Sequence, residues 1–195
     1  MDYKLVIGVV AAIIGLISYI PYLRDCVKKK TRPSVYTWMI WTIMTLIAFV
    51  AQLKYGAGPG SFVLGIQAVI NVIVLVFAFR NNLKKRKINW VDKTCFSLAI
   101  IAILLWLVTG QGFYAVVLVT LADALAFTIT IKKTYFFPYE ETVVTYVFAG
   151  IKHFLAIVAM ESYSITTTLF PAYLVIFNII FVTMAIIRRK KITRR

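Results

Sequence analysis

Several polar side chains lie deep inside apolar segments of this chain, where lipid could not solvate them. Three of them are amides: Gln67, Asn71 and Asn178. A buried amide needs a hydrogen-bond partner or a water-filled cavity, because hydrocarbon supplies no such partner. An Asn amide presents two donors and two acceptor lone pairs, which suits a solute that bears hydroxyl or amide groups. The alternative for each amide is a hydrogen bond to a neighbouring helix, which is common in membrane bundles.

Three ionisable residues occupy similar depths: Asp123, Lys152 and His153. A charge at the bilayer centre costs about 2.5–3.5 kcal/mol on insertion scales, so such residues need a partner or a function. One interpretation is a buried ion pair between Asp123 and Lys152. The other is proton coupling, because carboxyl and imidazole groups can pass a proton between the two faces of a membrane. Both interpretations stay open at this point.

The chain lacks the residue patterns that enzymes and cofactor-binding proteins use. It has no hydrolytic triad, no phosphate-binding loop and no glycine-rich nucleotide motif. The single histidine, His153, argues against multi-histidine metal sites. We therefore expect no catalytic residues, no metal and no cofactor, and we interpret the chain as a protein that is not an enzyme.

Seven apolar segments would position these polar residues. Hydrophobic residues make up 62% of the chain and the mean hydropathy is +0.88, which leaves too little polar surface for a soluble domain. Each segment is close to the roughly 17–25 residues with which a helix crosses a bilayer, and spans of this length are helical in lipid. The segments cover residues 4–23, 35–53, 61–79, 94–109, 112–131, 143–160 and 166–187.

Charge sets the expected orientation. The chain has 22 Lys and Arg against 7 Asp and Glu, and 19 of the basic residues lie in alternate connections and in the tail. Basic connections stay in the cytoplasm, which predicts seven spans with the N-terminus outside and the C-terminus inside. Because these residues adjoin the span ends, the net charge of +15 indicates topology and attraction to anionic lipid head groups. It does not indicate nucleic-acid binding.

The first and last three segments resemble each other. Pro33 matches Pro138 at a separation of 105 residues, and Asn71 matches Asn178 at a separation of 107. Two three-helix copies with the same orientation need an inverting linker helix between them, so a parallel repeat is predicted. A pseudo-twofold axis along the membrane normal would then bring the two Asn side chains to facing positions, which favours a shared pocket. The predicted units are residues 1–88, the linker 89–110, and residues 111–195.

The segment "GLISYIPYLRDCVKKKTRPSVYTWMIWTI" resembles the first repeat of the PQ-loop/SWEET (MtN3-like) superfamily of seven-helix transporters. Gly15, Tyr19 and Pro21 fit the family pattern, while Tyr22 stands where that family has Gln. The chain is therefore similar to a divergent member. The resemblance implies a 3+1+3 arrangement of helices, with the N-terminus outside and the C-terminus cytoplasmic.

The resemblance also implies a pocket built from an Asn on the third helix of each repeat and an aromatic residue on the second. The resemblance therefore nominates Asn71, Asn178, Trp41 and Tyr146 as substrate-binding residues. Gln67 is added to this set because it lies at a similar depth in its span. Pro21 could kink its span, so Pro21 and Tyr22 are expected either to gate the pathway or to mark a helix end.

The function expected from these features is a carrier or facilitator that moves a small polar solute by alternating access through a midplane pocket. The cargo could be a sugar, an amino acid or a vitamin-like compound. The alternative is a seven-helix receptor or sensor, or a structural membrane protein without transport. The expected location is a bacterial cytoplasmic (inner) membrane, and a homo-oligomer is compatible with the sequence.

Overall fold

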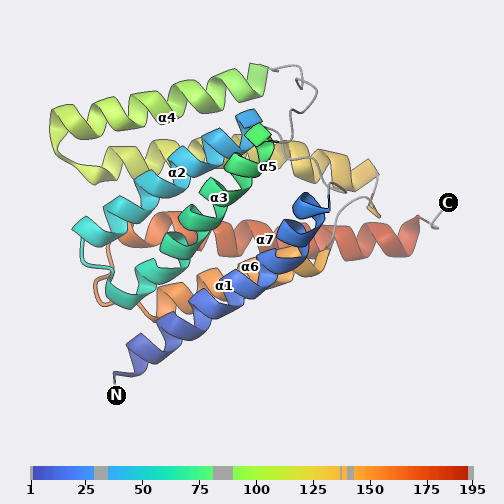
Figure 1. The fold of residues 1–195 in the computed structure, drawn as a ribbon, viewed down its shortest axis with the longest axis horizontal. Helices are drawn as coiled ribbons and strands as arrows, with labels where there is room; N and C mark the ends of the chain where they lie inside the picture. The colour runs from blue at the N-terminus through green and yellow to red at the C-terminus, as the bar shows by residue number, and fades with distance from the viewer. Residues whose placement is uncertain (1, 29–34, 81–89, 137, 140–142, 193–195) are drawn as a thin grey trace.

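The computed structural model describes residues 2–28, 35–80, 90–136, 138–139 and 143–192. The described residues form seven α-helices and one 3₁₀ turn, η1 (Gly58–Ser61), and each α-helix lies on one of the seven predicted apolar segments (Figure 1). The α-helices are α1 (Tyr3–Val27), α2 (Val35–Lys54), α3 (Phe62–Arg80), α4 (Trp90–Thr109), α5 (Gly112–Phe136), α6 (Val143–Val158) and α7 (Ile165–Lys191). The basic connections 29–34 and 81–89, with Pro33, lie outside the described residues.

Four helices of the described chain are long and apolar enough to cross a membrane. They are α1, α3 together with η1, α5 and α7, each 22 to 27 residues long over its apolar stretch. The apolar stretches of α2, α4 and α6 are shorter. Many outward-facing side chains are apolar, such as Ile17 at 57% exposure and Leu107 at 77%. A helical chain with this surface is an integral membrane protein, because its outer face matches lipid and its backbone is satisfied within the helices.

The helices pack in a pattern that repeats. α3 packs between α1 and α2, and α7 packs between α5 and α6. We call α1, α2 and α3 the first triplet and α5, α6 and α7 the second. The two triplets meet where α1 contacts α6 and where α2 contacts α5, and α4 packs against α5 and α2. Figure 1 shows α4 along one edge of the bundle, on the opposite side from α1 and α6. Exchanging α1 with α5, α2 with α6 and α3 with α7 leaves the contacts among these six helices unchanged, while α4 contacts only α5 and α2 among the described elements.

Small side chains let the linker helix approach its neighbour. Ala99 and Ala102 of α4 and Ala115 and Ala122 of α5 are all fully buried. Without a hydrophobic driving force between helices in lipid, close approach of small residues supplies the packing energy. This explains how α4 forms part of the largest apolar cluster of the protein together with α2, α5 and α7.

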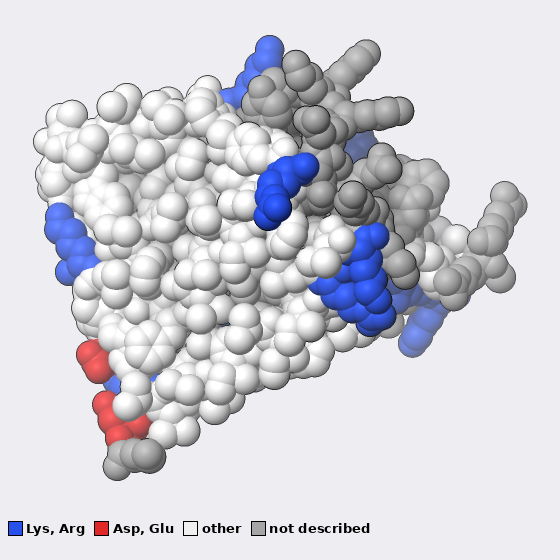
Figure 2. All heavy atoms as spheres, in the orientation of Figure 1, with Lys and Arg blue, Asp and Glu red and all other residues white. Residues whose placement is uncertain are grey.

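Charge is divided between the two ends of the bundle. Figure 2 shows Lys and Arg gathered toward the end at which α7 finishes, while the acidic side chains visible on this face lie at the opposite end. The last turn of α7 alone contains Arg188, Arg189, Lys190 and Lys191. Cations at this position also interact favourably with the negative end of the helix dipole. We call the two ends of the molecule the basic end and the acidic end.

The two triplets are joined at the acidic end. The backbone N–H of Glu161, just after α6, donates to the carbonyl of Ala57, just before η1, at 3.2 Å. Lys4 of α1 donates from Nζ to the carbonyl of Met160 at 2.8 Å. A side chain at Gly60 would meet the Ala156 carbonyl of α6 at 2.6 Å, so only glycine allows this close approach. These contacts hold the acidic end of the bundle closed.

Candidate functional site

Asn71 lies on α3 and is 1% exposed. Its Nδ2 donates to Thr45 Oγ1 at 3.0 Å and to the Trp41 carbonyl at 3.3 Å, both on α2. The amide therefore joins the two neighbouring helices of the first triplet through both of its N–H groups. This is the interhelical hydrogen bond that the sequence left open as the alternative for a buried Asn.

Asn178 lies at the matching position on α7 and is 3% exposed, but its bonding differs. Its Nδ2 donates to the carbonyl of Leu174, one turn earlier on the same helix, at 2.6 Å. Its Oδ1 is buried and has no hydrogen-bond partner among the described residues. The two amides share a depth and a degree of burial, and no hydrogen bond in the described chain joins one to the other.

One difference between the triplets lies beside the Asn178 amide and explains why its Nδ2 donates within α7 and not to α6. At the separation of 105 residues that relates α2 to α6, Thr45 corresponds to Gly150. A side chain at Gly150 would touch Asn178 Cβ at 3.5 Å, so this glycine faces the amide just as Thr45 faces Asn71. Gly150 offers no hydroxyl. An unpaired buried acceptor costs about 1–3 kcal/mol, and a bound solute or a water could recover that energy.

This difference predicts the outcome of two substitutions at one position. In Gly150→Ser the new hydroxyl should donate to Asn178 Oδ1, while Gly150→Ala fills the same space without a donor. We expect Gly150→Ser to melt about 3 °C above Gly150→Ala, because a net hydrogen bond is worth about 1 kcal/mol. If Asn178 Oδ1 binds the solute, uptake should also be about tenfold lower for the Ser variant than for the Ala variant. Equal melting temperatures and equal uptake for the two variants would contradict this assignment.

The nominated aromatic residues lie on α2 and α6 in different surroundings. Trp41 is 37% exposed and its ring contacts Trp38 edge-on at 5.3 Å between centroids. Tyr146 is half-buried and stacks on Phe181 of α7 at 3.9 Å. The second triplet therefore packs its aromatic residue within the helix core, while the first leaves a Trp face available.

Lys152 of α6 is 2% exposed and reaches across to the first triplet. Its Nζ donates to Gln67 Oε1 of α3 at 2.8 Å and lies 4.9 Å from the centre of the Tyr19 ring of α1. A side chain at Gly15 would touch Lys152 Cδ at 3.5 Å, so the lysine stem runs along a glycine of α1. Three helices from both triplets thus surround one ammonium group.

Asp123 and Lys152 take different partners in the structure. Asp123 Oδ2 accepts a hydrogen bond from the Tyr173 hydroxyl of α7 at 2.9 Å. The direct ion pair that the sequence left open as one interpretation is not among the contacts of the described residues. The Tyr19 ring packs on Lys152, while the Tyr173 hydroxyl bonds to Asp123.

His153 is 1% exposed, and its Nδ1 has no hydrogen-bond partner in the part of the chain that the structure describes. No group of three or more His, Cys, Asp or Glu side chains gathers at metal-binding distance among the described residues. His153 on α6 and Asp123 on α5 therefore share no metal-binding cluster among the described residues.

Pro21 does not end its helix. α1 continues through Pro21 to Val27, so the interpretation of Pro21 as a helix end is wrong. Proline is tolerated within membrane helices where neighbouring polar groups or a local adjustment of the helix satisfy the freed backbone carbonyl. The Tyr22 ring packs on Trp38 of α2 at 5.3 Å. This contact joins α1 to α2 on the basic side of the Asn71 level.

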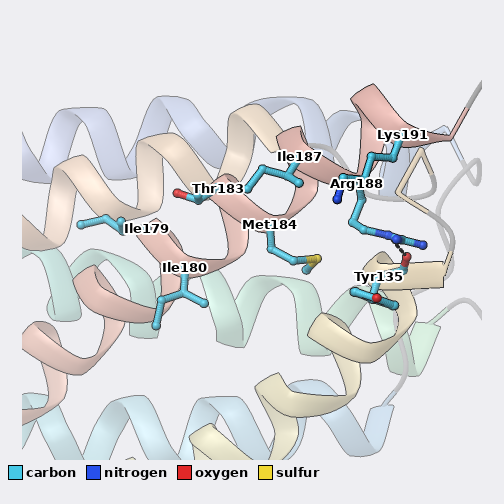
Figure 3. A pocket seen from close by; sticks show the side chains of 8 residues that line it. All are labelled: Tyr135, Ile179, Ile180, Thr183, Met184, Ile187, Arg188 and Lys191. Atoms are coloured by element: carbon cyan, nitrogen blue, oxygen red, sulfur yellow. Dashed lines mark hydrogen bonds between the residues drawn. The ribbon is translucent and has the colours of Figure 1, made fainter.

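A surface groove of about 430 Å³ lies elsewhere, on the outer side of α7 near the basic end (Figure 3). Arg188 spans it, donating from Nε to the Tyr135 carbonyl at 2.8 Å, with its guanidinium 4.0 Å from the Tyr135 ring centre. The groove is lined by Tyr135, Ile179, Ile180, Thr183, Met184, Ile187, Arg188 and Lys191. It contains none of the nominated pocket residues.

Sequence reasoning missed three residues that the structure brings into the site. Thr45 and Gly150 escaped notice because a hydroxyl or a glycine within a span is unremarkable by itself. The signal was available, since both lie at the separation of 105 residues already used to align the triplets. Tyr173 gave no such signal, because its contact with Asp123 joins residues 50 positions apart.

Comparison of the chain with protein-family models, with curated proteins and with solved structures gives no match.

Proposed function

We propose that the protein is a carrier for a small polar solute, built from two parallel three-helix repeats and an inverting linker helix. In this proposal all seven helices cross the membrane. The repeats are residues 1–88 and 111–195, and residues 89–110 contain the linker. The basic end faces the cytoplasm, so the N-terminus is outside. The proposed kinship is with the PQ-loop/SWEET superfamily, as a divergent member.

One observation carries the proposal: the contacts among α1, α2, α3, α5, α6 and α7 keep the same pattern when the two triplets are exchanged. In each triplet the third helix lies in the middle and carries a buried Asn at the same level. A carrier with such a repeat binds its solute between the repeats near the midplane and exposes the site by rocking them. The cross-triplet hydrogen bonds at the acidic end support a state that is closed toward that side.

The proposed binding groups are Asn178 Oδ1, the Asn71 amide, the exposed face of Trp41, Tyr146 and Gln67. Asn178 Oδ1 supports the assignment most strongly, because it is a buried acceptor without a partner in the described chain. Pro21 and Tyr22 are the proposed gate on the basic side, where Tyr22 packs between α1 and α2. Asp123 is the proposed coupling residue.

The proposed setting is a bacterial cytoplasmic membrane, with anionic lipids around the basic end. The groove on α7 supports this partner, because its apolar wall of Ile179, Ile180 and Ile187 ends at Arg188 and Lys191. An acyl chain would lie along the isoleucines while its head group reaches the two cations.

Uptake into proteoliposomes tests the proposal. Purified protein should equilibrate or accumulate at least one labelled sugar, amino acid or vitamin-like solute above the level in protein-free liposomes. A receptor or a structural protein would bind a solute without moving it. Binding without any uptake across the whole solute panel would overturn the carrier assignment.

A further inference from the structure

Lys152 has a buried amino group without a carboxylate partner among the described residues. It is among the largest fully buried side chains of the described residues. Its contacts are the amide oxygen of Gln67 and the aromatic ring of Tyr19. No carboxylate of the described residues forms an ion pair with it, and Asp123, the partner that the sequence suggested, bonds to Tyr173. Burying an ammonium group that contacts only uncharged groups costs free energy. Ionisable residues within membrane spans therefore mark candidate functional sites.

The groups around Lys152 fit one kind of ligand. The ammonium has three N–H donors, of which one is given to Gln67 Oε1. Gln67 Nε2 makes no hydrogen bond to the described residues, so its two N–H donors are also available. Donors from a cation and an adjacent amide match the two oxygens of a carboxylate, and such charge-assisted hydrogen bonds are about twice as strong as neutral ones.

The position of this cluster relates it to the amide level. Gln67 precedes Asn71 by four residues on α3, so the two lie on one face, about 6 Å apart along the helix axis. Lys152 follows Gly150 by two residues, so the two face different sides of α6, Gly150 toward Asn178 and Lys152 toward Gln67. A solute bound at Lys152 would therefore reach the Asn71 side of the pocket through Gln67.

The cluster exists in one triplet only. At the separations that align the triplets, Lys152 corresponds to Ile47 and Gln67 corresponds to Leu174. Two apolar residues thus stand where the other half has a cation and an amide. The two halves of the proposed pocket therefore differ in polarity, and a symmetric neutral solute would gain nothing from the cation and amide on one side.

We propose that Lys152 and Gln67 form a carboxylate-binding subsite and that the transported solute is a small organic anion. This inference rests on the proposed carrier function and specifies its substrate class. The ammonium binds the carboxylate, Gln67 Nε2 donates to its second oxygen, and the Tyr19 ring holds the ammonium in place. Solute binding thus supplies the negative charge that the described residues do not place beside Lys152.

Thermal unfolding of the purified full-length protein tests the subsite. The probes are the sodium salts of acetate, lactate, succinate and glutamate at constant ionic strength, each compared with its neutral or less charged amide. We expect at least one carboxylate to raise the melting temperature by about 4 °C at ten times its Kd, and the amide to have no effect. Failure of all four carboxylates to shift the melting temperature would overturn the proposal.

Substitutions separate binding from folding. Lys152→Gln should lose the shift and, without ligand, should melt at or above the wild-type temperature, because it removes an unpaired buried charge. Lys152→Arg should retain part of the shift, and Lys54→Gln, at the acidic end of α2, should retain all of it. A carboxylate shift that persists in Lys152→Gln would overturn the subsite, as would a ligand-free Lys152→Gln that melts well below the wild type.

Uptake measurements distinguish this inference from the carrier proposal. Uptake of a neutral solute, with no carboxylate shift, would overturn the anion assignment and leave the carrier standing. A carboxylate shift that depends on Lys152, with no uptake of any solute, would overturn the carrier and leave the anion site.

Discussion

Replacing both amides, as Asn71→Ala with Asn178→Ala, should abolish solute uptake while the protein remains folded. Each amide is expected to contribute a hydrogen bond to the solute worth about 1–1.5 kcal/mol, or roughly tenfold in affinity. Each single variant should therefore lower uptake at limiting solute about tenfold, and the double variant about 100-fold. Initial uptake rates in proteoliposomes, normalised to incorporated protein, provide the measurement.

The two single variants should differ in stability, and this difference is a control on the structure itself. Asn71→Ala removes a hydrogen bond from the buried Thr45 hydroxyl, so its free energy of unfolding should fall by about 1–3 kcal/mol. Asn178→Ala removes an amide whose oxygen is already unpaired, so its stability should change little. Gln111→Ala, an exposed amide between α4 and α5, should change neither uptake nor stability. Wild-type uptake by the double variant would reject the pocket.

Asp123→Asn should abolish the response of uptake to an imposed pH gradient. Asp123 is the acidic side chain that the structure places within the apolar bundle, where it accepts a hydrogen bond from Tyr173. An amide cannot exchange a proton between the two faces, so gradient-driven uptake should fall to the level measured without a gradient. Exchange of labelled for unlabelled solute should continue, because exchange needs no net proton movement.

Two further variants define the role of the carboxylate. Tyr173→Phe removes the hydrogen bond and keeps the acid, so a gradient response should remain with an altered pH profile. Glu161→Gln, at the acidic end, is the matched control and should behave as wild type. An unchanged gradient response in Asp123→Asn would show that the carboxylate only bonds to Tyr173 and would remove the coupling role.

Helix positions were predictable because they depend on local properties. Apolar length and the self-sufficient hydrogen bonding of helices in lipid place all seven helices, and their ends fall within five residues of the predicted limits. The later end of α1 at Val27 was missed, because the predicted span ended at residue 23, before Arg24, and the two interpretations of Pro21 as a kink or as a helix end were both open. In a packed bundle the lost backbone bond is tolerated, so the helix continues.

The partners of the buried charges were not predictable from sequence. Asp123 and Lys152 were the evident pair by charge, yet each bonds to a neutral side chain. Which groups meet depends on how α1, α3 and α7 rotate about their axes, and apolar periodicity is too weak in nearly uniform apolar helices to set that rotation. The burial of Asn71 and Asn178 could be anticipated from depth, while the unpaired oxygen of Asn178 could not, because it depends on which groups of the neighbouring helices reach the amide.

Two-sided accessibility of the pocket tests the central claim most directly. Gly150→Cys, in a protein whose buried Cys26 and Cys95 are replaced by Ser, places one thiol beside Asn178. Oriented proteoliposomes are then treated with a membrane-impermeant thiol reagent, added on the outer or the inner face alone. A carrier that rocks its two triplets about a midplane site exposes this position to each side in turn, so the thiol should react from both faces. Reaction from one face only would contradict alternating access.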